Sequence, residues 1–226
     1  MPDGGTIGDW QGARDEALAL VAAATERGLL LRLVGSAGIR LHLPEMERLM
    51  DGVRPPPKDL DFVCRKQDRN ALRAMFEERG YENDRDMMVA MEGHRYLFAH
   101  GGTGMKIDVF VGRLDFCHRI ELGERLARHP VSIPIEELVL HKLQIVRLTD
   151  NDCLDLGVML ATMAPTEEGG PHILSTQELL APARPTGASG EPRPRTSRRC
   201  ADARKRAASM HWARTRASES PGVPRR

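Results

Sequence analysis

The fold of this chain is decided around residues 29–38, which read LLLRLVGSAG. The first six residues form a short apolar run, and such a run between turn residues predicts a buried strand. The turn at residues 35–38 follows directly and opens a short predicted helix that runs through Leu43. A strand that passes through a glycine turn into a helix indicates a domain in which helices pack on a sheet.

A second strand is predicted at residues 59–64, which read DLDFVC. The stiff triplet at residues 55–57, PPP, leads into it. Polar and apolar residues alternate in this stretch, as they do in a half-buried strand. Asp59 and Asp61 are two positions apart, so we expect both carboxylates to project from the same face of the sheet.

The remaining elements alternate between helical and strand patterns over the first 170 residues. Helices are predicted at 11–27, 68–79, 135–148 and 152–163, and antiparallel strands at 87–91, 95–100 and 105–111, with turns at 92–94 and 101–104. Local hairpins mixed with helices predict an α+β domain with one mixed sheet. We place this domain at residues 1–170, with its core at about 29–163.

Asp108 is the third acidic residue that lies in a predicted strand, at residues 105–111. Its neighbours Ile107 and Val109 are apolar, so the alternation puts Asp108 on the opposite face from them. If this strand lies beside the one that carries Asp59 and Asp61, three carboxylates share one patch. Oxygen ligands of this kind suit Mg²⁺, and a pair of such ions can stabilise the attacking and leaving oxygens of a phosphoryl transfer.

Gly35 and Ser36 follow a strand and open a helix. Glycine allows a close approach of the backbone, and a helix N-terminus offers free N–H groups to a phosphate. The Ser36 hydroxyl offers one more hydrogen bond. A phosphate cradle and a carboxylate cluster together indicate nucleotidyl transfer more strongly than either feature does alone.

These elements resemble the pattern of the nucleotidyltransferase superfamily over residues 29–163. That pattern is an apolar residue, Gly, Gly or Ser, then an Asp-x-Asp strand and a third acidic strand residue. Residues 35–43, 58–62, 134–144 and 152–155 are similar to the abortive-infection toxin-like nucleotidyltransferases of the AbiEii type. The spacer between Ser36 and Asp59 is longer than is usual in the superfamily.

The resemblance implies a mixed sheet of the nucleotidyltransferase type and a Mg²⁺-dependent transfer of a nucleoside monophosphate from an NTP to a hydroxyl. It implies Asp59 and Asp61 as metal ligands, with Asp108 as a third ligand or as the base that activates the acceptor. The acceptor stays open between a protein side chain, an RNA end and a small molecule. A toxin-like relative also suggests an antitoxin-like protein partner.

Lys142 lies on the apolar stripe of the predicted helix 135–148. A cation in that position needs an anionic partner or a route to water, and a triphosphate would serve. We therefore predict nucleotide binding by Lys142, with a snorkelling side chain as the alternative. Asp152 and Asp155 are interpreted as supporting or helix-capping residues.

The C-terminal part differs in composition from the rest. Residues 181–226 hold 12 of the 33 Lys and Arg residues but only 3 of the 32 Asp and Glu residues, so the body is acidic and the tail is basic. Such a segment buries too little apolar surface to offset its chain entropy, and we expect residues 171–226 to be disordered. Three interpretations stay open: a nucleic-acid-binding arm, a solvated extension, and the out-of-frame translation of a GC-rich gene.

The four cysteines are scattered, and no apolar run reaches the roughly 18 residues that span a bilayer. Both observations favour a cytoplasmic protein without a membrane partner. Two alternatives to the enzyme remain at this stage. One is a catalytically inactive relative that binds a nucleotide or a protein, and the other is a nucleic-acid-binding protein that acts through its Arg-rich tail.

Overall fold

The computed structural model describes residues 10–167 and 173–180, and within them it has the expected α+β architecture. A five-stranded mixed sheet has the order β1-β2-β5-β4-β3. Its strands are β1 (Leu31–Leu33), β2 (Asp59–Cys64), β5 (Lys106–Val111), β4 (Arg95–His100) and β3 (Tyr81–Asn83). β2 and β5 are parallel, whereas β1–β2, β5–β4 and β4–β3 are antiparallel.

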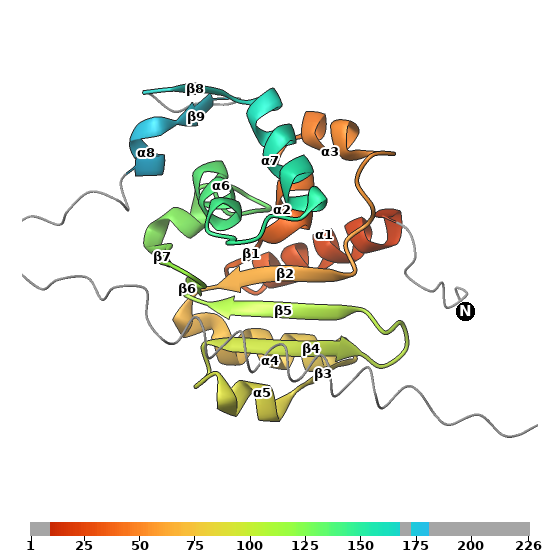
Figure 1. Ribbon diagram of the computed structural model, residues 1–226. Helices are drawn as coiled ribbons and strands as arrows, with labels where there is room; N and C mark the ends of the chain where they lie inside the picture. Colours follow the sequence, from red (N-terminus) through yellow and green to blue (C-terminus); the bar gives the residue numbers. More distant parts are fainter. Residues whose placement is uncertain (1–9, 168–172, 181–226) are drawn as a thin grey trace, which may run out of the picture.

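Helices cover both faces of the sheet. One core joins α1 (Trp10–Glu26) and α4 (Arg69–Glu78) to one face, through residues such as Leu60 and Phe62. The other core joins the opposite face, through Val63 and Phe110, to the remaining helices. These are α2 (Gly35–Arg40), α3 (Pro44–Met50), α6 (Ile135–Leu143) and α7 (Asp150–Thr162). Figure 1 shows these four helices gathered on the β1–β2 side of the molecule.

Small elements complete the described part of the chain. The short helix α5 (Arg85–Ala90) and the 3₁₀ turn η1 (Lys66–Asp68) flank β3 and α4. After β5 come a ribbon of β6 (Arg113–Asp115) and β7 (Arg119–Glu121) and the 3₁₀ turn η2 (Gly123–Ala127). β8 (Ala164–Thr166), β9 (Ile173–Ser175) and α8 (Thr176–Leu180) lie beyond α7 (Figure 1).

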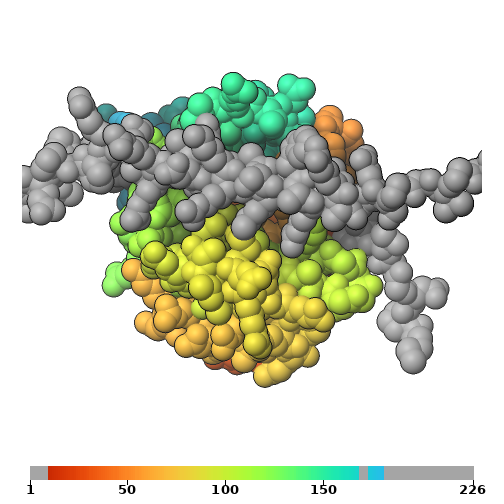
Figure 2. All heavy atoms as spheres, turned by 60° about the horizontal axis from the view of Figure 1, so that its bottom comes forward, coloured from red at the N-terminus to blue at the C-terminus, as the bar shows by residue number. Residues whose placement is uncertain are grey.

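Three predicted elements differ from the structure. The helix predicted through Leu43 ends at Arg40, and a separate helix, α3, follows it. Residues 87–90 are not a strand but belong to helix α5, with Met91 as its C-cap, because the Asp84 side chain caps that helix by accepting a hydrogen bond from the Met87 N–H at 3.0 Å. No residue of α5 is buried, and this part of the chain lies on the surface shown in Figure 2. The predicted helix 135–148 ends at Leu143, with Gln144 as its C-cap.

Residues 173–180 pack on the body, so the ordered chain continues past the expected limit at residue 170. The Ser175 N–H donates to Glu136 Oε1 at 3.0 Å, and Leu174 is buried. Arg125 bridges the buried Glu137 at 2.6 Å and Glu178 of α8 at 3.2 Å. This clamp fixes α6, the helix that carries Lys142. The basic tail predicted beyond residue 180 lies outside the described residues.

A buried polar cluster joins the end of α2 to the segment that leads into α6. The rings of His42 and His129 stack with their centroids 4.2 Å apart. The Ser132 hydroxyl lies 2.8 Å from His42 Nδ1, and Ser132 is fully buried. Burial, together with the nearby His129, lowers the pKa of His42 to about 3, so its imidazole is neutral at pH 7.

Three of the four cysteines fall within the described residues. Cys64, Cys117 and Cys153 are free thiols there, and Cys64 is buried. In the same part of the chain no helix is long and apolar enough to cross a bilayer.

Candidate active site

The central strand pair brings together the two carboxylates that the sequence places on different strands. β2 and β5 pair in parallel with Asp61 directly opposite Asp108. Side chains at paired positions of adjacent strands point to the same face, so both carboxylates lie on the face covered by α2 and α6. Asp59 lies two residues before Asp61 and is exposed, whereas Asp108 is only 7% exposed. The prediction that these strands are neighbours is confirmed.

The pKa values of Asp61 and Asp108 are both raised above their ordinary values. Burial, reinforced by Asp108 and Asp59, raises the pKa of Asp61 to about 7. Burial also raises the pKa of Asp108, although Arg95 opposes this shift. Carboxylates with raised pKa values in a shared patch are the expected result when like charges meet without a cation between them.

Arg95 is a partner of Asp108 that the sequence analysis did not identify. Its Nε donates to both carboxylate oxygens of Asp108, at 2.8 and 2.9 Å, and its Nη2 donates to Oδ2. Arg95 stands opposite Phe110 in the β4–β5 register, and its guanidinium carbon lies 4.9 Å from the centre of that ring. The third carboxylate of the predicted set is therefore neutralised by a side chain of the neighbouring strand.

Gly35 has a role in the structure that differs from the predicted approach to phosphate. Its φ is +63°, and a Cβ built on it would lie 2.5 Å from Asp61 Oδ2. A side chain at position 35 would therefore collide with the carboxylate, and only glycine suits this backbone conformation without strain. The Val34 N–H donates to the Asp61 carbonyl at 2.8 Å and holds the turn against β2.

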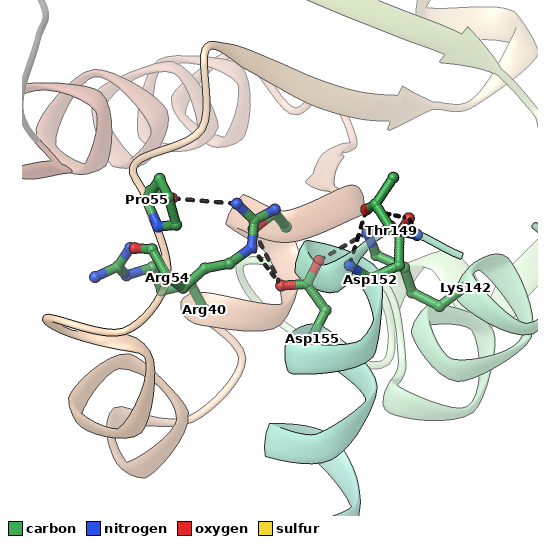
Figure 3. Close-up of polar contacts among 8 residues, drawn as sticks. Arg40, Arg54, Pro55, Lys142, Thr149, Asp152 and Asp155 are labelled. Atoms are coloured by element: carbon green, nitrogen blue, oxygen red, sulfur yellow. Dashed lines mark hydrogen bonds and ion pairs between the residues drawn. The ribbon is translucent and has the colours of Figure 1, made fainter. Parts of the chain in front are cut away.

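Lys142 obtains its anionic partners from α7. Its side chain is buried and forms ion pairs with Asp152 at 2.9 Å and Asp155 at 2.7 Å. Asp155 is fully buried, and its Oδ1 also accepts from Arg54 Nε at 2.9 Å (Figure 3). The Ser36 hydroxyl lies 3.5 Å from the same oxygen. One buried carboxylate thus joins the glycine turn, the Arg54 segment and α6.

Asp152 has the helix-capping role that was one of its two predicted interpretations. It forms a capping box with Thr149 at the start of α7, in which each side chain bonds to the backbone of the other residue. Partial burial opposes ionisation, but the bonds from Lys142 and Thr149 prevail and lower the pKa of Asp152 to about 2. Asp152 is therefore ionised over the whole physiological range.

Arg40 fixes the segment that brings Arg54 into the site. Its side chain is 1% exposed and donates to Asp51 at 3.3 Å and to the Arg54 carbonyl at 3.4 Å. Figure 3 shows Arg40 and Arg54 beside Asp155, with the Arg54 guanidinium also reaching the carbonyl of Pro55, at 3.2 Å. Neither arginine was identified from the sequence, because a lone arginine next to a proline run carries no local signal for a buried contact.

Some of these groups line a hollow of about 330 Å³, which is at the lower end of the range for small-molecule sites; Asp108 is not among them. Its lining includes the predicted Gly35, Ser36, Asp59, Asp61 and Lys142, and adds Arg54, residues 55–58, His141 and Asn151. The lining holds both carboxylates, Asp59 and Asp61, and cations, Arg54, Lys58 and Lys142. A lining with both signs of charge suits a ligand that brings a cation together with phosphates.

The donors fit a hard cation in part. Asp59 and Asp61 offer the oxygen ligands that Mg²⁺ prefers. Within residues 10–167 and 173–180, however, no three His, Cys, Asp or Glu side chains are gathered closely enough to hold a metal ion. The pairing of Asp108 with Arg95 is consistent with this arrangement.

Comparisons with known proteins give a limited result. No protein-family model matches this chain, and no curated protein matches it. Three solved structures are similar in fold, all at low identity. Similarity at this level says nothing about the activity or substrate of this chain.

The first is the lincosamide antibiotic adenylyltransferase LnuA in its lincomycin-bound form, with 14% identity, 64% of this chain and 94% of that chain covered, and a TM-score of 0.44. The second is the antibiotic-resistance factor ANT(2'')-Ia, with 13% identity and a TM-score of 0.47; the match covers 92% of this chain and 100% of that chain. The third is an antigenic nucleotidyltransferase-like protein from Paracoccidioides brasiliensis, with 16% identity and a TM-score of 0.41; the match covers 75% of this chain and 86% of that chain.

Proposed function

We propose that this protein transfers a nucleoside monophosphate from an NTP to a hydroxyl acceptor, in a Mg²⁺-dependent reaction. The observation that carries the proposal is the parallel register that sets Asp61 beside Asp108, with Asp61 lining a hollow that Lys142 and Arg54 also line. The sequence resemblance to AbiEii-type nucleotidyltransferases agrees with this geometry and stays a prediction at the level of that subgroup.

In the proposed reaction the acceptor oxygen forms a bond to the α-phosphorus, and the bond from that phosphorus to the pyrophosphate oxygen breaks. Asp59 and Asp61 would hold Mg²⁺, which when bound neutralises phosphate charge; whether one or two ions bind is open. Lys142 and the Gly35–Ser36 turn would bind the triphosphate. Asp108 would act as a third ligand or accept the proton of the acceptor hydroxyl.

The charge on the pyrophosphate must be neutralised as it leaves. Lys142 is suited to this because its ammonium is already fixed by Asp152 and Asp155, so it needs little reorganisation when the ligand binds. Arg54 is held in place by the same carboxylate, that of Asp155. Positioning and charge neutralisation by preset groups are the main contributions expected of a protein in phosphoryl transfer.

One observation favours a second candidate, a nucleotide-binding relative without catalytic activity. Arg95 holds Asp108 through both carboxylate oxygens, which leaves that carboxylate less available to a metal ion or a hydroxyl. The two candidates share nucleotide binding and differ in turnover. A radiolabelled NTP assay that follows pyrophosphate release with protein, RNA and small-molecule acceptors separates them.

Calorimetry of NTP binding with and without Mg²⁺ tests the shared part. We expect wild-type protein to bind NTP in a Mg²⁺-dependent manner and the Asp59→Ala/Asp61→Ala variant to lose this dependence. The matched control is Glu82→Ala/Asp86→Ala, which removes two exposed carboxylates on β3 and α5. Failure of folded wild-type protein to bind any NTP would refute the proposal.

A further inference from the structure

A row of side chains, with their rings tilted against one another, extends from Asp108 to His141, the neighbour of Lys142 in the chain. It begins with the Arg95 guanidinium over the Phe110 ring. The Phe110 and Phe116 rings follow at 5.2 Å between centroids, and the Phe116 and His141 rings at 5.0 Å. These four side chains come from β4, β5, the turn after β6, and α6. We call them the aromatic row.

His141 connects the aromatic row to the proposed nucleotide site. Its side chain lines the same hollow as Asp61 and Ser36, and it directly precedes Lys142 on α6. Its Nδ1 is buried and has no hydrogen-bond partner. Burial, assisted by the Lys142 charge, lowers the pKa of His141 to about 4, so the ring is neutral at pH 7 and repels no cation. A ligand at Lys142 therefore lies next to this row.

Phe116 differs from the other four phenylalanines of the chain. They are 6% exposed or less, whereas Phe116 is 37% exposed. A singly exposed apolar residue needs no explanation by itself. Here, however, the exposed ring is fixed between Phe110 and His141, and its place is fixed further by the His118 N–H, which donates to Gln144 Oε1 at 3.0 Å. The result is a partly exposed aromatic ring that contacts His141, a residue of the hollow's lining.

We propose that the open face of Phe116 is the platform on which the base of the bound nucleotide stacks. The inference rests on the proposed function, because it assumes that the triphosphate lies along Lys142. A planar base is the occupant that best fits, since aromatic rings and guanidinium groups bind any base through its π-face. The Phe116 ring itself has no hydrogen-bonding group, so this platform holds purines and pyrimidines with little selectivity.

Comparison of ATP with inorganic tripolyphosphate isolates the base from the phosphates. Both ligands are titrated in the presence of Mg²⁺ into wild type, Phe116→Leu and Phe116→Tyr. In Phe116→Leu the affinity for ATP falls about 5- to 100-fold, the range expected for one lost stacking contact, and the affinity for tripolyphosphate stays within about twofold. Phe116→Tyr retains an aromatic face and keeps wild-type affinity for both ligands.

Leu154→Ala is the control for a general surface effect, because Leu154 is as exposed as Phe116 but lies on α7. It leaves both affinities unchanged. The platform is refuted if Phe116→Leu binds ATP as tightly as wild type, and the phosphate site then stands without it. Equal losses for ATP and tripolyphosphate also refute it, since Phe116 would then only support the site. If wild type binds neither ligand, the proposed function fails and the platform fails with it.

Discussion

Asp155→Asn tests the polar network that holds the candidate site together. The replacement keeps the size of the side chain and removes its charge. Asp155 is fully buried, and its carboxylate neutralises Lys142 at 2.7 Å and Arg54 at 2.9 Å. The side chains of these two cations are 7% and 10% exposed. The variant therefore leaves two almost buried cations, of which only Lys142 retains a carboxylate partner among the described residues, Asp152.

The size of the effect follows from the remaining partners. Breaking a buried ion pair costs about 3–5 kcal/mol, because a charge is left uncompensated. Lys142 keeps Asp152 at 2.9 Å, and Arg54 keeps only the carbonyl of Pro55 at 3.2 Å. We therefore expect a loss near the lower limit, about 3 kcal/mol in the free energy of unfolding. For a body of this size that loss lowers Tm by about 6–12 °C.

Urea unfolding monitored by circular dichroism measures this loss, and Asp115→Asn is the matched control. Asp115 also pairs with arginines, at 3.3 and 3.4 Å, but it is 46% exposed, so its replacement changes stability by less than about 1 kcal/mol. Lys142→Met and the double variant complete a double-mutant cycle, with a coupling energy of about 1–3 kcal/mol expected. A loss below about 1 kcal/mol for Asp155→Asn, or no coupling, would refute the reasoning.

Two further changes test other parts of the structure. Gly35→Ala combines left-handed strain with a collision against Asp61 Oδ2, and we expect it to lower the free energy of unfolding in urea by about 2–4 kcal/mol. The control, Gly52→Ala, has the strain of φ +75° but open space around it, and it lowers the same free energy by only about 1 kcal/mol. Similar losses for both variants would argue against the contact. His42 has a depressed pKa, so the unfolded chain takes up its proton first, and stability is lost as pH falls from about 6.5 toward 3, by up to about 1.4 kcal/mol per pH unit. His42→Asn should therefore show a shallower loss of unfolding free energy between pH 6.5 and 4.5 than wild type, and parallel curves would contradict this.

The sequence was sufficient to predict the sheet strands that carry the carboxylates. β2 and β5 have strong apolar alternation, and the polar positions within them were assigned to one face before their pairing was known. The short helix α5 was missed because its sequence is apolar enough for a strand, and only the Asp84 cap decides the outcome. The end of α6 at Leu143 was missed because the exposed Val146 and Leu148 continue an apolar pattern beyond the last helical turn.

The carboxylates and glycine of the candidate site were easier to predict than its arginines. Asp59, Asp61 and Gly35 lie in short patterns that can be recognised locally. Arg95 meets Asp108 only through the β4–β5 register, and Arg54 meets Asp155 across 101 positions of sequence. Such contacts depend on tertiary packing, which leaves no periodic trace in either segment. The sequence analysis predicted that Lys142 needs an anionic partner, but it did not predict that Asp152 and Asp155 of α7 are those partners.

The parallel β2–β5 pair also determines when the candidate site exists during folding. Asp61 and Asp108 are 47 positions apart, whereas the β4–β5 hairpin closes through a turn of a few residues. Loop-closure entropy opposes the long-range pairing, so hairpin contacts form early and the two carboxylates meet late. Their mutual repulsion is then felt only near the native state. Replacing Asp61, which within the described part of the chain has no arginine pair such as Asp108 forms with Arg95, should therefore slow unfolding more than it speeds refolding.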